Sequence, residues 1–426
     1  MHWRYVRLLI TSCIGAVLLA AAVNYVVDPY GLHRWIERDG FNRRKPKAGL
    51  STDLVKPYDV LRVRPRTLLL GSSRAETGID PDDPVWPEAM RPVYNLALRG
   101  RGIDAGYKSL RHVLQALKPD TVIVGLELVD FIVREPAAGA TPAAAPEVPE
   151  FERRLLADSD GAPNPEYRLQ SIKDQISSLF SLNALVDSVL TLALQGRAGQ
   201  PDLTPHGFNP MHEYEPVVRL EGHYSLFRQI ETNYLSIYIR SPKTVYARGT
   251  TRSTELDRVR ALIKLCRDSG VRLLLYIHPS HAHVLEAYRI AGLWPTFEEW
   301  KRALVAIVEE DARAHPHAAP IALWDFGAYD EFTTERVPSA LEKGVKMRWF
   351  WEAGHYKAEL GRLMVARMLG AAQPGGFGAI LDRHNLEPRL AEIRAGQRRY
   401  EALRADEVAG LEALAREIRA RAAPRH

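Results

Sequence analysis

The fold of this chain follows from the stretch Arg66-Thr-Leu-Leu-Leu-Gly-Ser-Ser-Arg-Ala-Glu-Thr-Gly-Ile-Asp80. Its apolar run Leu68–Leu70 leads directly into Gly71-Ser72-Ser73-Arg74, which is typical of a buried parallel strand followed by a tight turn. In open α/β sheets, ligands bind outside the carboxyl ends of the strands. Ser73 is therefore placed for chemistry, although the same pattern also serves as a permissive turn with a helix N-cap.

Five apolar runs predict parallel strands, and between them lie helical patterns with apolar residues three and four positions apart. The strands are expected at Thr67–Gly71, Pro92–Leu98, Thr121–Leu128, Val271–Pro279 and Pro320–Phe326, and helices at Asp104–Leu117, Glu255–Ser269 and Thr296–Glu310. Alternation of strands and helices is the signature of a doubly wound sheet. We therefore predict an α/β fold built on a doubly wound, five-stranded parallel sheet.

The amino terminus predicts the compartment. After the basic residues Arg4 and Arg7, the run Leu8–Val27 contains no charge and is long enough to cross the roughly 30 Å hydrocarbon core as a helix. The basic flank predicts that the N-terminus stays inside and the body is exported. We expect a signal anchor, a single transmembrane helix in the bacterial inner (cytoplasmic) membrane, with the body in the periplasm or otherwise outside the cytoplasm. A signal peptide cleaved near Ala20-Ala21-Ala22 is the alternative.

Composition excludes several classes of protein. The 426 residues are 46% hydrophobic, enough for a large core, and the 57 Lys+Arg nearly balance the 52 Asp+Glu, so the chain is not disordered. No Lys/Arg-rich block is interleaved with aromatic residues, and we therefore expect no nucleic-acid partner. The two cysteines, Cys13 and Cys266, fit no metal motif and predict no disulfide.

The domain organisation is expected to have four parts. A transmembrane anchor at 1–30 precedes an irregular membrane-proximal neck at 31–65, an α/β domain at 66–370 and a helical extension at 371–426. An insertion at 135–250 interrupts the α/β domain after its third strand. It begins with an Ala/Pro tract, continues with helical patterns at Tyr167–Phe180 and Leu182–Leu194, and is expected to cap the active edge of the sheet.

Residues suited to nucleophilic chemistry follow the strand ends in order. Ser73 follows the first strand, Gly100 follows the second in Asn95-Leu-Ala-Leu-Arg-Gly-Arg-Gly102, and Glu127 ends the third. Late in the chain, Glu352-Ala-Gly-His355 can supply a base and the acid that fixes its tautomer. Taken alone, that last pair is equally explained as a helix-start carboxylate and a surface histidine.

These motifs and their order resemble the SGNH (GDSL-like) hydrolase superfamily. The chain looks most similar to the membrane-anchored SGNH-like proteins of bacterial cell-surface polysaccharide O-acylation, the alginate acetylation and D-alanyl transfer type, over residues 60–370 without the insertion. The resemblance implies a flavodoxin-like SGNH fold and a catalytic triad of Ser73, His355 and Glu352. It also implies an oxyanion hole formed by the backbone N–H groups of Gly100 and Ser73.

Three positions depart from the family pattern. Ser72 stands where Asp is usual, and the orienting acid is Glu352 rather than Asp. The Asn that donates to the oxyanion is replaced by Glu127, whose ionised carboxylate cannot donate, and losing one donor typically costs about 10²–10³ in rate. Two hypotheses remain: an exported serine O-acyltransferase or esterase acting on cell-surface or secreted polysaccharide, and a non-catalytic glycan-binding or assembly component of a polysaccharide export or modification machine.

Four residues are candidates for substrate binding: Arg74, Glu127, His281 and Trp351. Arg74 can clamp an anionic sugar or phosphate, while a solvated or salt-bridged arginine is the ordinary alternative. Trp351 beside His355 suits a wall for a sugar ring. His281 is a candidate for substrate contact or an ordinary loop histidine.

We expect neither metal nor organic cofactor. His278, His281 and His283 lack the spacing of a metal site. The expected partners are a glycan or acyl-ester substrate, the lipid bilayer, and a membrane O-acyltransferase or polysaccharide export protein. Asp325 and Asp330 are reserve candidates for the triad acid.

Overall fold

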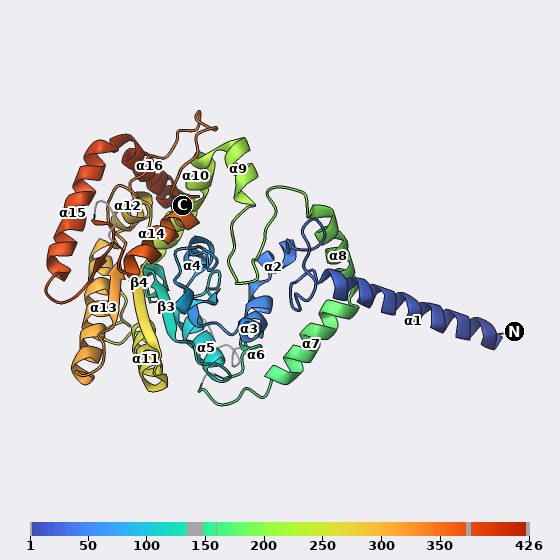
Figure 1. Cartoon of the computed structure of the whole chain (residues 1–426). Helices are drawn as coiled ribbons and strands as arrows, with labels where there is room; N and C mark the ends of the chain where they lie inside the picture. The colour runs from blue at the N-terminus through green and yellow to red at the C-terminus, as the bar shows by residue number, and fades with distance from the viewer. Residues whose placement is uncertain (1, 134–147, 159, 372–375, 423–426) are drawn as a thin grey trace.

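The computed structural model describes residues 2–133, 148–158, 160–371 and 376–422, so most of the predicted Ala/Pro tract at 135–150 lies outside the described residues. One long helix, α1, projects from an α/β body (Figure 1). The body is built on a six-stranded sheet in the order β2-β1-β3-β4-β5-β6. The α/β class predicted from the sequence is confirmed.

The strands are β1 (Thr67–Leu70), β2 (Val93–Asn95), β3 (Thr121–Leu126), β4 (Arg272–Ile277), β5 (Ala322–Asp325) and β6 (Ala379–Ile380). The first five pair in parallel and each lies within a predicted run, whereas β6 pairs antiparallel with β5. The sheet therefore has one strand more than predicted. With two residues, β6 is too short to leave a periodic pattern in the sequence.

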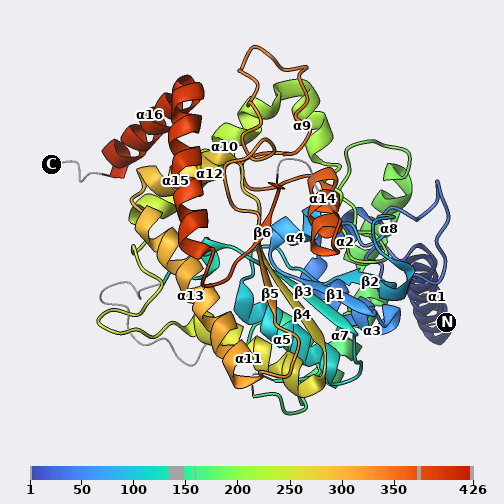
Figure 2. The same ribbon diagram turned by 60° about the vertical axis from the view of Figure 1, so that its left-hand side comes forward.

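The α-helices of the body comprise α2 (Pro46–Leu50), α3 (Thr52–Val63), α4 (Ser73–Gly78), α5 (Ile103–Leu114), α6 (Glu150–Arg153), α7 (Tyr167–Phe180), α8 (Leu182–Leu194), α9 (Tyr214–Glu221), α10 (His223–Arg240), α11 (Thr254–Ser269), α12 (Ala282–Ile290), α13 (Trp294–Ala314), α14 (Ala358–Met368), α15 (Leu386–Leu403) and α16 (Ala405–Ala422). Helices α3, α5, α11 and α13 pack in a row beside the sheet (Figure 2). Every residue of β1 and β3 is buried, as expected for parallel strands covered on both faces.

Helix α1 (His2–Val27) is exposed along most of its length and is long and apolar enough to span a membrane. The neck that follows is not irregular as predicted, because it contains α2 and α3. Pro57 lies inside α3, and the polar side chains Lys56 and Asp59 are buried there. These residues hide the helical periodicity of the segment.

The insertion divides into two halves. Helices α7 and α8 match the predicted ranges but lie against α1 (Figure 1). Only the second half, with α9 and α10, lies where the sequence was expected to place a cap. There His223 of α10 contacts the backbone carbonyl of Trp351 at 2.9 Å.

The C-terminal helices dock on the body. Leu390 and Ile393 of α15 and Leu411 of α16 are buried. His283 of α12 lies between two carboxylates, with Nδ1 2.6 Å from the buried Glu231 of α10 and Nε2 2.8 Å from the half-buried Glu407 of α16. This contact joins the C-terminal extension to the core.

Candidate active site

Ser73 is held at the junction of β1 and α4. It is the first residue of α4, and the Ser72 side chain caps that helix by accepting a hydrogen bond from the Arg74 N–H at 3.4 Å. Gly71 has a φ of +149°, and a Cβ there would lie 3.1 Å from the Ala75 Cβ, so the turn requires glycine. The turn leaves the Ser73 side chain half-buried and accessible.

The structure brings Ser73, His355 and Glu352 together. Ser73 Oγ lies 2.8 Å from His355 Nε2, and His355 Nδ1 is hydrogen-bonded to Glu352 Oε1. The other carboxylate oxygen of Glu352 accepts the Gly354 N–H at 2.7 Å. The Glu352 side chain is fully buried, whereas that of His355 is 16% exposed. The base is therefore oriented by a buried acid and open toward the serine.

A tight loop places the base and the acid. Phe350 and Tyr356 form an antiparallel bridge, and the Trp351 N–H donates to the His355 carbonyl at 2.9 Å. This loop runs directly into α14. Glu352 and His355, three residues apart, consequently turn toward the same point outside the end of β1.

Arg74 and Glu127 form an ion pair next to the turn that carries Ser73. Arg74 Nε lies 2.9 Å from Glu127 Oε2, and Arg74 Nη1 donates to Ser280 Oγ at 2.5 Å. Glu127 also accepts the Ser72 hydroxyl. Burial lowers the pKa of the Arg74 guanidinium, but the Glu127 carboxylate outweighs burial and holds that pKa well above its usual value.

The predicted substrate-binding roles of Arg74 and Glu127 do not fit this placement. Their side chains are 3% and 9% exposed and are bonded to each other. Both hold the loop that carries the nucleophile. The charge of Arg74 thus accounts for a buried carboxylate at Glu127.

His281 does not lie where a substrate can reach it, which corrects the predicted substrate contact. It is fully buried, its Nε2 lies 2.7 Å from the Glu335 carbonyl, and its Nδ1 accepts the His283 N–H at the start of α12. Burial, with a smaller contribution from the nearby His283, lowers its pKa well below the usual value. His281 is a neutral helix cap.

Gly100 lies in the loop after β2, with a φ of +64° and nothing near the position of a Cβ. Ser73, as the first residue of α4, presents its N–H at a helix N-terminus. The role of these two N–H groups as oxyanion donors stays a prediction.

Asp325, a reserve candidate for the triad acid, forms an ion pair with Lys301 instead. Both of its carboxylate oxygens contact Lys301 Nζ, at 2.9 and 2.8 Å.

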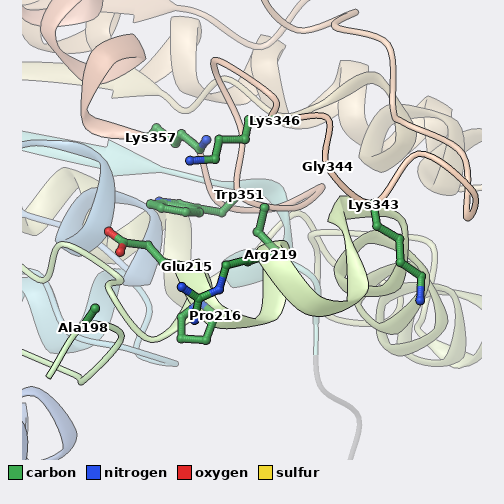
Figure 3. A pocket seen from close by; sticks show the side chains of 10 residues that line it. Ala198, Glu215, Pro216, Arg219, Lys343, Gly344, Lys346, Trp351 and Lys357 are labelled. Carbon is green, nitrogen blue, oxygen red and sulfur yellow. The ribbon is translucent and has the colours of Figure 1, made fainter.

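Trp351 borders a cleft of about 320 Å³ next to the triad loop (Figure 3). The cleft is lined by Ala198, Glu215, Pro216, Val218, Arg219, Lys343, Gly344, Lys346, Trp351 and Lys357. Lys357 Nζ lies 4.5 Å from the centroid of the Trp351 ring. Lys346 and Lys357 lie on one side of this ring and Glu215 and Arg219 on the other, whereas the ammonium group of Lys343 points away. The aromatic floor is surrounded mainly by positive charge.

Several residues of this region gave no signal in the sequence. Tyr214 of α9 packs edge-on against Trp351, with centroids 6.2 Å apart. Burial and the Glu352 carboxylate raise its pKa to about 12. Glu76 of α4 is fully buried between Lys56 and Arg99, at 2.9 and 2.7 Å. A single sequence does not reveal such pairings, because each partner comes from a different segment.

Comparison of the chain with protein-family models gives no match. Comparison with curated proteins likewise gives no significant match. The function must therefore be argued from the geometry of the site.

Proposed function

We propose that this chain is a membrane-anchored serine acyl-transfer protein, an O-acyltransferase or esterase of the SGNH type acting on cell-surface or secreted polysaccharide. The observation that carries the proposal is the hydrogen-bonded series from Ser73 Oγ through His355 to Glu352. The order β2-β1-β3-β4-β5 supports a flavodoxin-like SGNH fold, and the triad lies outside the carboxyl end of β1.

The geometry permits a two-step transfer. Ser73 Oγ attacks the carbonyl carbon of an acyl ester while its proton passes to His355 Nε2, and the donor alcohol leaves with that proton. In the second step, His355 takes a proton from a glycan hydroxyl or from water, whose oxygen attacks the acyl-Ser73 carbonyl. Ser73 then leaves and recovers its proton from His355. Glu352 keeps the imidazole in the required tautomer and stabilises its cation.

The cleft beside the triad loop supports a sugar substrate with an anionic group. An indole face is suited to pack against a sugar ring, and Lys346 and Lys357 lie beside the Trp351 face. The apolar helix α1 would hold this cleft near a membrane surface, which we infer to be the periplasmic face of the bacterial inner membrane. A membrane O-acyltransferase or polysaccharide export protein would then be the natural neighbour.

A fluorophosphonate probe tests the proposal on the full-length protein in membranes. The wild type should be labelled, Ser73→Ala should not, and Ser177→Ala, which changes an exposed serine on α7, should be labelled like the wild type. The rate of acetyl transfer from acetyl esters should then be measured for labelled and for unlabelled protein, with and without glycan acceptors. A folded wild-type protein that takes no label, or takes it equally after Ser73→Ala, would instead favour a non-catalytic glycan-binding or assembly component.

A further inference from the structure

Helices α7 and α8 have their polar and apolar faces reversed with respect to a water-soluble helix pair. Apolar side chains that are 37–76% exposed follow the outer face: Leu169, Ile172, Ile176, Phe180, Leu182, Val186, Val189, Leu190 and Leu192. The residues turned toward the protein are mostly polar: Gln170, Asp174, Ser178, Ser188 and Thr191. In water the apolar face of a surface helix turns inward, so this arrangement indicates an apolar surrounding for the pair.

Polar side chains on the inner face of α7 are hydrogen-bonded to the rest of the protein. Asp174 accepts hydrogen bonds from Arg154 Nε at 2.7 Å, from Gln170 Nε2 at 2.8 Å and from the Tyr58 hydroxyl at 2.8 Å. The orientation of α7 is therefore fixed by specific contacts. Its outer apolar face cannot turn inward without breaking them.

The pair is also bonded to α1 at the end nearest the body. Asn24, a polar residue in the uncharged run of α1, is 1% exposed. Its Nδ2 donates to the Leu179 carbonyl at 2.8 Å, and its Oδ1 accepts the Ser188 hydroxyl at 2.9 Å. Asn24 thus satisfies a carbonyl at the end of α7 and a hydroxyl on α8, which otherwise would be costly in an apolar medium.

We propose that α7 and α8 form a wedge that inserts into the lipid leaflet on the body side of the membrane, next to α1. The axis of α8 is bent by 61° from the direction of α7, and the junction of the two helices lies against α1 (Figure 1). Each arm of 14 or 13 residues is about 20 Å long, shorter than the roughly 30 Å hydrocarbon core, which favours one leaflet over a crossing. Phe180 and Leu182 at the junction are the deepest side chains.

Lipid is the occupant that the charges favour. Arg168 and Lys173 are exposed on α7 next to the apolar face, where they can reach lipid phosphates while the apolar side chains stay buried. The apolar outer surface of the wedge is also continuous with the exposed apolar surface of α1, where Leu18 and Leu19 are 59% and 69% exposed. The wedge gives the body a second hold on the membrane and so limits its rotation about α1. This inference does not depend on the serine chemistry.

Fluorescence quenching in proteoliposomes of the purified full-length chain tests the wedge. In a Cys13→Ser background, in which Cys266 is buried, bimane is attached to Leu182→Cys at the junction, to Leu18→Cys in α1, or to Leu341→Cys. Leu341 is the matched control, because it is a leucine that is 95% exposed outside the wedge. Lipids with nitroxides on their acyl chains should lower the bimane emission of Leu182→Cys and Leu18→Cys at least about twofold. They should leave the emission of Leu341→Cys nearly unchanged.

Iodide in the aqueous phase should show the opposite order. Quenching of Leu182→Cys by iodide and not by nitroxide lipids would overturn the proposal, since the junction would then face water. Protection of Leu182→Cys from both quenchers, with Leu18→Cys quenched by lipid, would also overturn it. In that case a second copy of the chain would cover the apolar face.

Discussion

Replacing Glu127 by Gln tests whether the buried Arg74–Glu127 pair holds the nucleophile turn. The two side chains are 3% and 9% exposed, and Nε and Oε2 are 2.9 Å apart. Gln has nearly the volume of Glu and keeps an acceptor for the Ser72 hydroxyl, so the substitution removes mainly the charge. Removing one partner of a buried ion pair typically costs about 3–5 kcal/mol, because the other charge stays buried without compensation.

We expect Glu127→Gln at the lower end of that range, about 3 kcal/mol, since Ser280 still accepts from Arg74. At about 2.1 cal/mol/K of unfolding entropy per residue, an α/β domain of roughly 300 residues shifts by about 1.5 °C per kcal/mol, so the melting temperature should fall by about 5 °C. Circular dichroism melts of the full-length protein in one detergent measure this loss. Arg74→Met should be destabilised as well, because it leaves Glu127 buried without its partner.

A double-mutant cycle measures the interaction energy between Arg74 and Glu127 separately from the contribution of each side chain alone. Arg74→Met combined with Glu127→Gln should lose less stability than the two changes added together, by about 2 kcal/mol, because neither then leaves an unpaired buried charge. The reasoning would be refuted by a Glu127→Gln protein that melts within about 2 °C of the wild type. Additive losses in the double variant would refute it equally, since the two residues would then act independently.

Three further predictions concern the chemistry, the cleft and the C-terminal helices. Glu352→Gln should slow fluorophosphonate labelling of the serine by about 10²–10⁴-fold at unchanged melting temperature, because the imidazole loses its orienting charge. Lys346→Ala should raise the KM for an anionic glycan acceptor at low salt, with Lys343→Ala, whose ammonium points away, as the matched control; equal effects would contradict the assignment. Burial lowers the pKa of His283, but its two glutamate partners outweigh burial and raise it from 6.5 to about 9. The stability advantage of the wild type over His283→Gln should therefore be complete below pH 6.5 and disappear as the pH rises through about 9, as measured by urea unfolding at pH 6, 8 and 10; an advantage independent of pH would argue against a protonated His283.

The parts of the fold that the sequence predicted are those encoded locally. The run Leu68–Leu70 and the glycine after it specify a strand and its turn within seven residues, and the structure has both there. The short motif Glu352-Ala-Gly-His355 likewise forms its own loop. Helices α7 and α8 of the insertion were predicted with the observed bounds, since their apolar residues repeat at helical spacing, whereas α6, α9 and α10 were not predicted.

The errors in the predicted site concern the surroundings of a side chain. Arg74 and His281 were assigned to substrate because they lie next to strand ends, but a position in the chain does not tell whether a side chain points outward or into the protein. Arg74 meets Glu127 and Ser280 from other strand ends. His281 meets the carbonyl of Glu335. Each partner lies more than fifty residues away in the sequence, beyond the reach of any local pattern.

The helices α7 and α8 show the same limit more generally. Their periodicity identifies an apolar face and a polar face, but the pattern is identical whether the apolar face meets a protein core or lipid. The sequence therefore led to the expectation of a cap over the sheet. Polar contacts determine how the two helices are oriented. Asp174 and Ser188 form hydrogen bonds on the inner side, so the apolar face points outward. A buried polar group must be paired, whereas an apolar one needs only an apolar neighbour, and for this reason the polar residues of an amphipathic helix determine which way it turns.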